Sequence, residues 1–190
     1  MKTDIILAGV GGQGILSIAT ILGHAALRDN LYLKQAEVHG MSQRGGDVMS
    51  CLRISSDPIA SDLIPRGKAD MVISLEPMEA LRYVEQLAPT GRIITSSEPF
   101  VNIPNYPEHA EVMAELNALP NVTVIAAEEI AKSVATPRSS NMALLGAAAP
   151  YLGLPAEMLE DSIRAVFGAK GEKIVNDNLA AFRAGLAAAR

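Results

Sequence analysis

The 190-residue sequence contains one cysteine, no tryptophan, and only three phenylalanines and four tyrosines. The single thiol, Cys51, cannot form an internal disulfide, and it cannot hold a cysteine-ligated iron–sulfur cluster, which uses about four thiolates. Its setting, VMSCLRI, is strand-like and favours a buried, unreactive thiol. The histidine and acidic residues show no metal-ligand spacing either. We therefore expect no metal or cluster held by this chain alone.

Basic residues are also scarce. There are 16 Lys and Arg against 21 Asp and Glu, which gives a formal net charge of −5. Nucleic-acid-binding proteins usually cluster Lys and Arg and often stack bases on aromatic rings, so no nucleic-acid partner is expected. The longest early apolar run is too short for a signal-peptide core or a membrane span. We expect a soluble, cytoplasmic protein with no membrane partner.

Apolar residues, by contrast, are abundant. They make up 49% of the chain, and charged residues make up 19%. Two interpretations remain open: part of the apolar surface is meant for a partner chain, or an alanine-rich helical core accounts for the fraction. The length suggests one domain, over residues 1–190.

Four glycines fall within six positions near the start of the chain, in the segment ILAGVGGQGILSIA. A strand, a glycine turn and a helix N-terminus together form a site for an anion, because the first helical N–H groups have no partner inside the helix. Gly9, Gly11 and Gly14 match the dinucleotide fingerprint G-x-G-x-x-G. That match alone is weak, since tight packing of a strand against a helix explains many such glycines.

The remaining pattern predicts an α/β fold: a single three-layer domain with a mixed, mostly parallel sheet and a helical C-terminal third. The loop at 39–46 is too short to hold a crossover helix, so the strands on either side of it should be antiparallel. A helix that begins in the segment PRSSN, with Ser139 or Ser140 as its cap, opens the helical third. We expect strands at 4–8, 31–38, 47–54, 70–75, 92–95 and 121–127, helices at 13–28 and 77–87, and an irregular loop at 98–110.

Two glycine-rich loops should meet at one edge of this sheet. The glycine turn ends the first strand and the loop HGMSQRGG ends the second, so their ends lie side by side if those two strands are parallel neighbours. A guanidinium beside free backbone N–H groups suits a phosphate or carboxylate. Alternatively, Arg44 pairs with Glu37 or a carbonyl. No catalytic residue is predicted, and the candidate binding residues are Gly11, Gly12, Gln13 and Gly14 on one wall and Gln43, Arg44, Gly45 and Gly46 on the other.

Several segments resemble the small subunit of 2-oxoacid:ferredoxin oxidoreductases. The resemblance spans nearly the whole chain, and EVHGMSQRGG is most similar to the β subunit of indolepyruvate:ferredoxin oxidoreductase. The γ subunits or domains of the pyruvate and 2-oxoglutarate enzymes are also similar. The segments that carry it are GVGGQGI, AEVHGMSQRGG, the strand through Arg53, the pair AD followed by SLEPMEALR, SNMALLGA and NLAAFRAG.

The resemblance implies a non-redox subunit that is inactive alone. The complete enzyme oxidatively decarboxylates a 2-oxo acid, passes electrons to ferredoxin and forms an acyl-coenzyme A. Thiamine diphosphate and iron–sulfur clusters would belong to larger partner chains, and coenzyme A would be a shared ligand at the glycine loops. Two alternatives stay open from the residues: a free-standing nucleotide-binding enzyme, and an assembly module without a ligand.

Overall fold

The structure is a computed structural model that describes residues 1–39 and 45–189. Its centre is a six-stranded sheet with the order β2-β3-β1-β4-β5-β6. β1, β4, β5 and β6 are parallel, and β3 is antiparallel to both of its neighbours. The strands are β1 (Lys2–Val10), β2 (Tyr32–His39), β3 (Asp47–Ser55), β4 (Ala69–Ser74), β5 (Leu87–Ser96) and β6 (Val122–Ile125).

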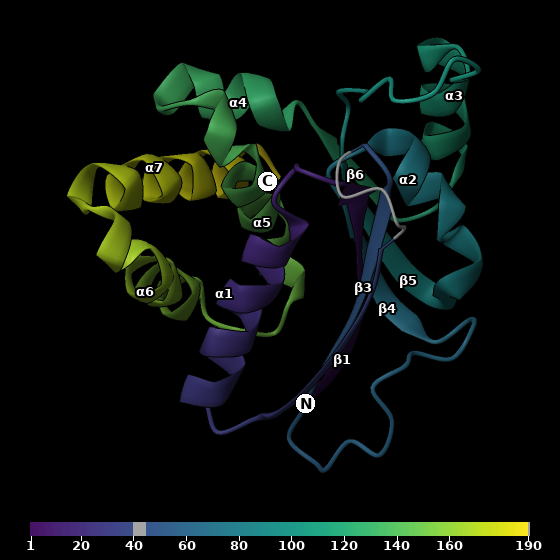
Figure 1. Cartoon of the computed structure of the whole chain (residues 1–190). Helices are drawn as coiled ribbons and strands as arrows, with labels where there is room; N and C mark the ends of the chain where they lie inside the picture. Colours follow the sequence, from purple (N-terminus) through teal and green to yellow (C-terminus); the bar gives the residue numbers. More distant parts are fainter. Residues whose placement is uncertain (40–44, 190) are drawn as a thin grey trace.

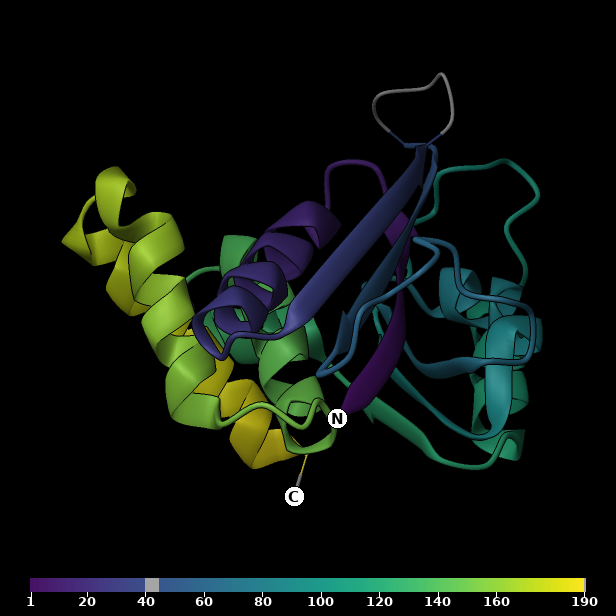
Figure 2. The ribbon, with the colours of Figure 1, turned by 90° about the horizontal axis from the view of Figure 1, so that it is seen from below.

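The mixed sheet is confirmed, but the predicted neighbourhood of the first two strands is wrong. β3 lies between β1 and β2 and pairs with each along its length, from Lys2 opposite Ser55 to Val10 opposite Asp47 on one side. Because the loop after β2 is short, β3 pairs antiparallel with β2. The second edge of β3 then pairs with β1. β1 and β2 still run in the same direction, and their carboxyl ends reach the same edge of the sheet (Figure 2).

Seven α-helices in the described ranges complete three layers and confirm the predicted fold class (Figure 1). Five helices lie on one side of the sheet and two on the other, as Figure 2 also shows from below. The five are α1 (Ile15–Arg28), α4 (Ala127–Val134), α5 (Ser140–Ala148), α6 (Ala156–Phe167) and α7 (Glu172–Ala188). The two are α2 (Pro77–Arg82) and α3 (His109–Ala118), and short 3-10 turns lie at Val84–Gln86, Pro137–Ser139, Ala149–Tyr151 and Gly168–Lys170.

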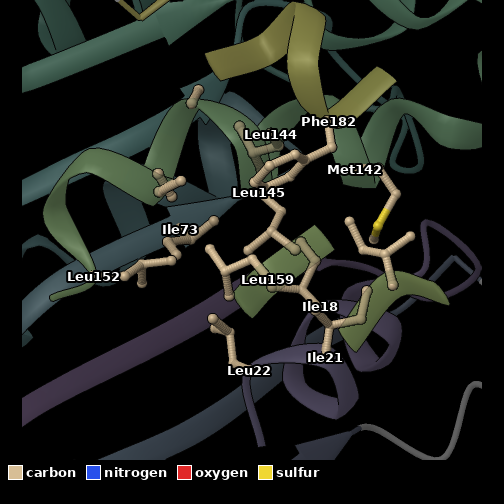
Figure 3. Packing of buried hydrophobic residues seen from close by; sticks show 14 of the residues in the cluster. Ile18, Ile21, Leu22, Ile73, Met142, Leu144, Leu145, Leu152, Leu159 and Phe182 are labelled. Atoms are coloured by element: carbon tan, nitrogen blue, oxygen red, sulfur yellow. The ribbon is translucent and has the colours of Figure 1, made fainter. Parts of the chain in front are cut away.

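The main core lies between the sheet and the five-helix layer. Ile18, Leu145, Leu159 and Phe182, from four different helices, converge there and are completely buried (Figure 3). Their positions belong to the apolar stripes that the 3.6-residue period predicts for this part of the chain. Cys51 is buried in β3, as its strand-like setting predicts.

Helices α5 and α7 approach each other closely at two glycines. A Cβ built on Gly146 would lie 2.0 Å from the Phe182 carbonyl oxygen, and one built on Gly185 would lie 1.8 Å from the Ala143 carbonyl oxygen. These distances are far inside van der Waals contact, so only glycine allows the two backbones to meet. The contact fixes the position of α7 relative to α5.

Several predicted boundaries are wrong. The helix predicted to reach residue 87 ends at Arg82, and β5 begins at Leu87, because Pro89 and Gly91 conceal the first half of that strand. The strand predicted at 121–127 ends at Ile125, and α4 begins at Ala127. Helix α3 begins at His109, inside the predicted 98–110 loop. Ser139 is the N-cap residue of α5, as predicted, but its side chain makes no capping hydrogen bond; the Thr136 side chain caps the preceding 3-10 turn by accepting from the Arg138 N–H.

A buried ion pair closes the opposite, amino edge of the sheet. The Arg53 guanidinium donates two hydrogen bonds to the Asp4 carboxylate, at 2.8 and 3.0 Å, and the Asp4 side chain is only 2% exposed. Arg53 also donates to the carbonyls of Ser61 and Leu63, and so holds the long connection after β3. Lys2 contacts the same carboxylate at 2.8 Å.

Candidate functional site

The two glycine segments meet at the carboxyl edge of the sheet. Gly11 N–H donates to the Gly46 carbonyl at 2.8 Å, and Gly45 N–H donates to the Gly11 carbonyl at 3.3 Å. The predicted convergence is therefore confirmed, although the start of β3, not adjacency of β1 and β2, brings the loops together. Gln43 and Arg44 lie outside the described residues.

The glycine turn adopts a conformation that side chains disfavour. Gly12 and Gly14 have φ of 105° and 86°, in the region that favours glycine. Gly14 is the N-cap of α1, and a Cβ there would lie 2.7 Å from the amide nitrogen of Asn141. The Asn141 amide instead donates to the Gly14 carbonyl at 3.2 Å. Glycine at position 14 thus lets α1 and α5 begin side by side.

Asn141 keeps one polar atom without a partner. Its side chain is buried, and among the described residues its Oδ1 finds no hydrogen-bond donor. Buried polar atoms in folded proteins nearly always have a partner, so an orphaned acceptor indicates a site for a water or ligand. Nothing in the sequence indicates the contact between Asn141 and the glycine turn, because the segment PRSSN predicts only a helix start.

A cleft of about 660 Å³ opens between the glycine turn, the segment at 136–141 and the start of α7. Gly12, Gln13 and Gly14 line one side, and Asn141 lies at its border with α5. The cleft is within the range of small-molecule sites, about 300–1,000 Å³. Gly11, Gly45 and Gly46 do not line it, so three residues of the first predicted wall face a second wall that the sequence does not predict.

The electrostatics of this cleft favour an anion. Three cations, Arg138, Lys170 and Lys173, line it, against one acidic residue, Asp177. Lys173 contacts Asp177 at 2.7 Å, and the Lys170 ammonium lies 5.2 Å from the centre of the Phe167 ring. The two lysines follow from no periodic pattern in the sequence; Lys170 ends the 3-10 turn between α6 and α7, and Lys173 lies in the first turn of α7.

Helix N-termini add to the positive potential. α1, α5 and α7 all begin at the cleft, and none of them has a side-chain cap in the described part of the chain. α1 and α5 also carry no acidic residue in the first turn. The free N–H groups and the aligned peptide dipoles of a helix N-terminus attract negative charge. The first turns of three helices and three cations therefore line one volume, and of these helices α7 alone carries an acidic residue, Glu172, in its first turn.

Other helix N-termini at the same edge are occupied by the protein's own carboxylates. The buried Glu76 accepts from the Glu79 N–H at 2.8 Å, from the Phe100 N–H at 3.3 Å and from the Tyr106 hydroxyl. Burial, followed by the neighbouring Glu76, raises the pKa of Tyr106 above its usual range, which keeps that hydroxyl a donor. This part of the edge is structural, and it fixes the start of the 97–108 loop.

The base of the hairpin between β2 and β3 is held by a second polar cluster. The Tyr83 hydroxyl donates to both oxygens of Asp47, at 3.1 and 3.0 Å. Nearby, Arg82 donates to the buried Glu79 at 2.8 Å. Burial raises the pKa of Glu79, and the Arg82 contact lowers it only in part. Asn102 donates to the Gly45 carbonyl at 2.7 Å and ties the 97–108 loop to the same hairpin.

The described residues contain no group of three or more His, Cys, Asp and Glu placed to hold a metal ion. None of their helices is long and apolar enough to cross a membrane.

Known proteins resemble this chain over its whole length. Indolepyruvate oxidoreductase subunit IorB of Methanothermobacter thermautotrophicus is 37% identical, with 100% of this chain and 98% of the relative covered. IorB of Pyrococcus horikoshii is 36% identical over 98% and 96% of the two chains. 2-Oxoglutarate synthase subunit KorC of Methanocaldococcus jannaschii is 30% identical over 100% and 95%.

Solved structures share the fold. The γ subunit of a keto/oxoacid ferredoxin oxidoreductase from Geobacter sulfurreducens superposes with a TM-score of 0.73, at 24% identity and 98% coverage of both chains. The 2-oxoglutarate:ferredoxin oxidoreductase of Magnetococcus marinus, described with 2-oxoglutarate, coenzyme A and succinyl-CoA bound, gives a TM-score of 0.76 at 23% identity. Here 99% of this chain matches 31% of that one. The pattern of the pyruvate ferredoxin/flavodoxin oxidoreductase family matches residues 4–188, and the chain belongs to that family.

Proposed function

We propose that this chain is the non-redox small subunit of a 2-oxoacid:ferredoxin oxidoreductase and that its cleft receives the phosphate-rich part of coenzyme A. The observation that carries the proposal is the cleft itself, where three cations and three uncapped helix N-termini surround one volume. Full-length similarity to subunits named for indolepyruvate and 2-oxoglutarate enzymes supports the class of complex. The identities of 35–37% to IorB favour indolepyruvate as the 2-oxo acid over pyruvate or 2-oxoglutarate.

Coenzyme A suits the chemistry of the cleft. It carries a diphosphate and a 3′-phosphate, and Arg and Lys side chains bind such groups through charge-assisted hydrogen bonds. Its adenine amine and its hydroxyls are donors, and the unpartnered Asn141 oxygen is an acceptor. The coenzyme A bound to the Magnetococcus enzyme supports the same ligand class.

The electron chemistry belongs to other chains in this proposal. Thiamine diphosphate and iron–sulfur clusters would reside on a larger partner, which passes electrons to ferredoxin, while residues 1–190 form one γ-type domain that binds and orients coenzyme A. The larger partner would bury at least a standard interface, about 1,200 Å² in total. The isolated chain should be colourless and should not oxidise 2-oxo acids. Visible absorbance from a stoichiometric cluster or flavin in the pure chain would contradict this.

The test is a kinetic measurement on the assembled complex. Replacing both Lys170 and Lys173 by alanine removes two of the three cleft cations. Hydrogen bonds to charged groups contribute about 1.5–3 kcal/mol, so the KM for coenzyme A should rise roughly ten- to hundredfold. Lys34→Ala is the matched control, because this exposed lysine donates to the Ala60 carbonyl, away from the cleft. An unchanged KM in a normally assembled double variant would favour an assembly module without a ligand.

Arg44 remains a separate prediction, because it lies outside the described residues. Arg44→Ala in the complex should weaken coenzyme A use, and Arg44→Lys should restore only part of it, since lysine lacks the planar fork of arginine. If Arg44 instead ties its loop to Glu37 or a carbonyl, the melting temperature or the assembly should fall while the KM for coenzyme A stays constant.

A further inference from the structure

The helical connections change face between β1 and β4. α1 follows β1 and packs in the five-helix layer, whereas α2 follows β4 and packs on the opposite face (Figure 1). In open α/β sheets, ligands bind in the crevice at the carboxyl ends of the strands where this change occurs. The fingerprint glycines stand at the same point, so this crevice is where a dinucleotide would be expected. The proposed function does not use it.

The side chain of Gln13 fills this crevice. Its Oε1 accepts from the Val10 N–H at 2.7 Å, and its Nε2 donates to the Leu75 carbonyl at 3.2 Å. One amide thus satisfies a free backbone group at the end of each of the two strands. A Cβ on Gly9 would lie 2.9 Å from the same Oε1, so the glycine spacing also makes room for Gln13.

Glu98 occupies the next anion-binding position along the edge. Its carboxylate accepts from the N–H groups of Glu128 and Glu129, at 2.8 and 2.9 Å, at the start of α4. It also accepts from the Ser96 hydroxyl at 2.6 Å. A helix N-terminus at the end of a strand is the position that a ligand phosphate takes in nucleotide-binding folds. Here a side chain of the protein already holds it.

Volume and charge separate the crevice from the cleft. The space left in the crevice is about 60 Å³, and its lining contains Glu98 and Glu128 but no basic residue. The cleft on the other side of Gln13 is about 660 Å³ and has more basic than acidic residues. An anionic ligand therefore meets repulsion on one side of the Gln13 side chain and attraction on the other.

We propose that Gln13 and Glu98 are specificity-determining residues that occupy the switch-point crevice in place of a nucleotide diphosphate and so direct the ligand to the cleft beside α5 and α7. The exclusion from the crevice stands on the contacts above. The use of the cleft rests on the proposed function.

Amide chemical shifts of the unaltered full chain test both parts, with adenosine diphosphate as the probe. Amides of Val10, Glu128 and Glu129 are bonded to the Gln13 and Glu98 side chains and report on the crevice. Amides of Gly12 and Gly14 report on the cleft. Adenosine diphosphate should shift the cleft amides and leave the crevice amides in place. Shifts in the crevice amides at saturation would overturn the proposal.

A gain-of-binding experiment tests the exclusion independently of the cleft. The background variant carries Lys170→Ala and Lys173→Ala, which weaken anion binding in the cleft. In that background, Gln13→Ala with Glu98→Gln should bind adenosine diphosphate at least tenfold more tightly by calorimetry than the background alone. Gln35→Ala in place of Gln13→Ala is the control, because it also removes a glutamine amide, with its hydrogen bond to Ser50, without opening the crevice. A folded variant with no gain would overturn the exclusion.

The two proposals fail in different ways. If the cleft amides stay unshifted while the crevice variant gains binding, the proposed function is wrong and the exclusion holds. If the crevice variant does not fold, the chemical shifts of the unaltered chain test the exclusion, because shifts of the crevice amides with adenosine diphosphate would overturn it.

Discussion

Gly185→Ala sets two opposing effects against each other in helix α7. On intrinsic propensity alone, alanine in a helix interior is more stable than glycine by about 1 kcal/mol. A Cβ at this position, however, would lie 1.8 Å from the Ala143 carbonyl oxygen, whereas ordinary contacts begin at 3.4 Å. The backbones of α5 and α7 must therefore separate by more than an ångström.

Separation of this size disturbs a packed interface between two helices. Overpacking a core costs about 1–3 kcal/mol and occasionally more, and the atom in the way here is backbone, which cannot rotate aside. The steric effect outweighs propensity, and a net loss of about 2 kcal/mol is expected. For a chain of this size, such a loss lowers the melting temperature by roughly 4–8 °C.

Urea and thermal unfolding measure this loss directly. Gly168→Ala is the matched control, because a Cβ there meets nothing within 4 Å and its φ of −53° suits any residue. That control should be neutral or stabilising by up to about 1 kcal/mol. A Gly185→Ala variant as stable as the wild type would show that α5 and α7 do not meet as closely as described. The shape of the cleft, which depends on that contact, would then be wrong as well.

Three further outcomes follow from other contacts. Arg53→Ala leaves the buried Asp4 with Lys2 as its remaining cation and should lower the free energy of unfolding in urea by about 3 kcal/mol. Arg66→Ala is the control: it breaks only the exposed ion pair with Glu85 and should lower the free energy of unfolding by less than about 1 kcal/mol. Burial raises the pKa of Asp4, but hydrogen bonds from Arg53 and Lys2 outweigh it and hold the pKa below its usual value. The stabilisation is therefore present above about pH 4 and lost as the pH falls below it, and Arg53→Ala should weaken this acid dependence. Gly14→Ala, at a φ of 86°, should raise the KM for coenzyme A in the assembled complex, because the new Cβ would displace the Asn141 side chain. An unchanged KM would mean that Asn141 does not shape the site.

The sequence predicts those features that depend on neighbours along the chain. The apolar stripes of α6 and α7, the buried strands β1 and β4, and the glycine turn each follow from a local period or a local backbone requirement. Boundaries are less certain from sequence, because Pro89 and Gly91 resemble a loop even though β5 runs through them. The insertion of β3 between β1 and β2 could not be predicted, since a strand with two open edges does not indicate which distant strand takes the second one.

The same distinction applies to the site. Gly12, Gln13 and Gly14 are visible in the sequence because a turn needs them, and the structure places them on the cleft. Lys170 and Lys173 look like ordinary surface lysines, and they reach the cleft only because α7 packs on α5 through glycines more than 35 positions apart in the chain. Contacts between distant segments, and the pairing of Gln13 with the end of β4, require the fold itself.

The position of β1 has a consequence for how the chain is made. β1 is synthesised before the other five strands, yet it lies between β3 and β4, and β4 is not complete until residue 74. At about 5–20 residues per second, the central strand waits several seconds for both neighbours. One face of the sheet waits longer still, because α5, which packs against β5 and β6, is synthesised after all six strands. Fragments that stop before residue 140 lack α5, α6 and α7 and so expose part of one face of the sheet, and they should aggregate where the full chain does not.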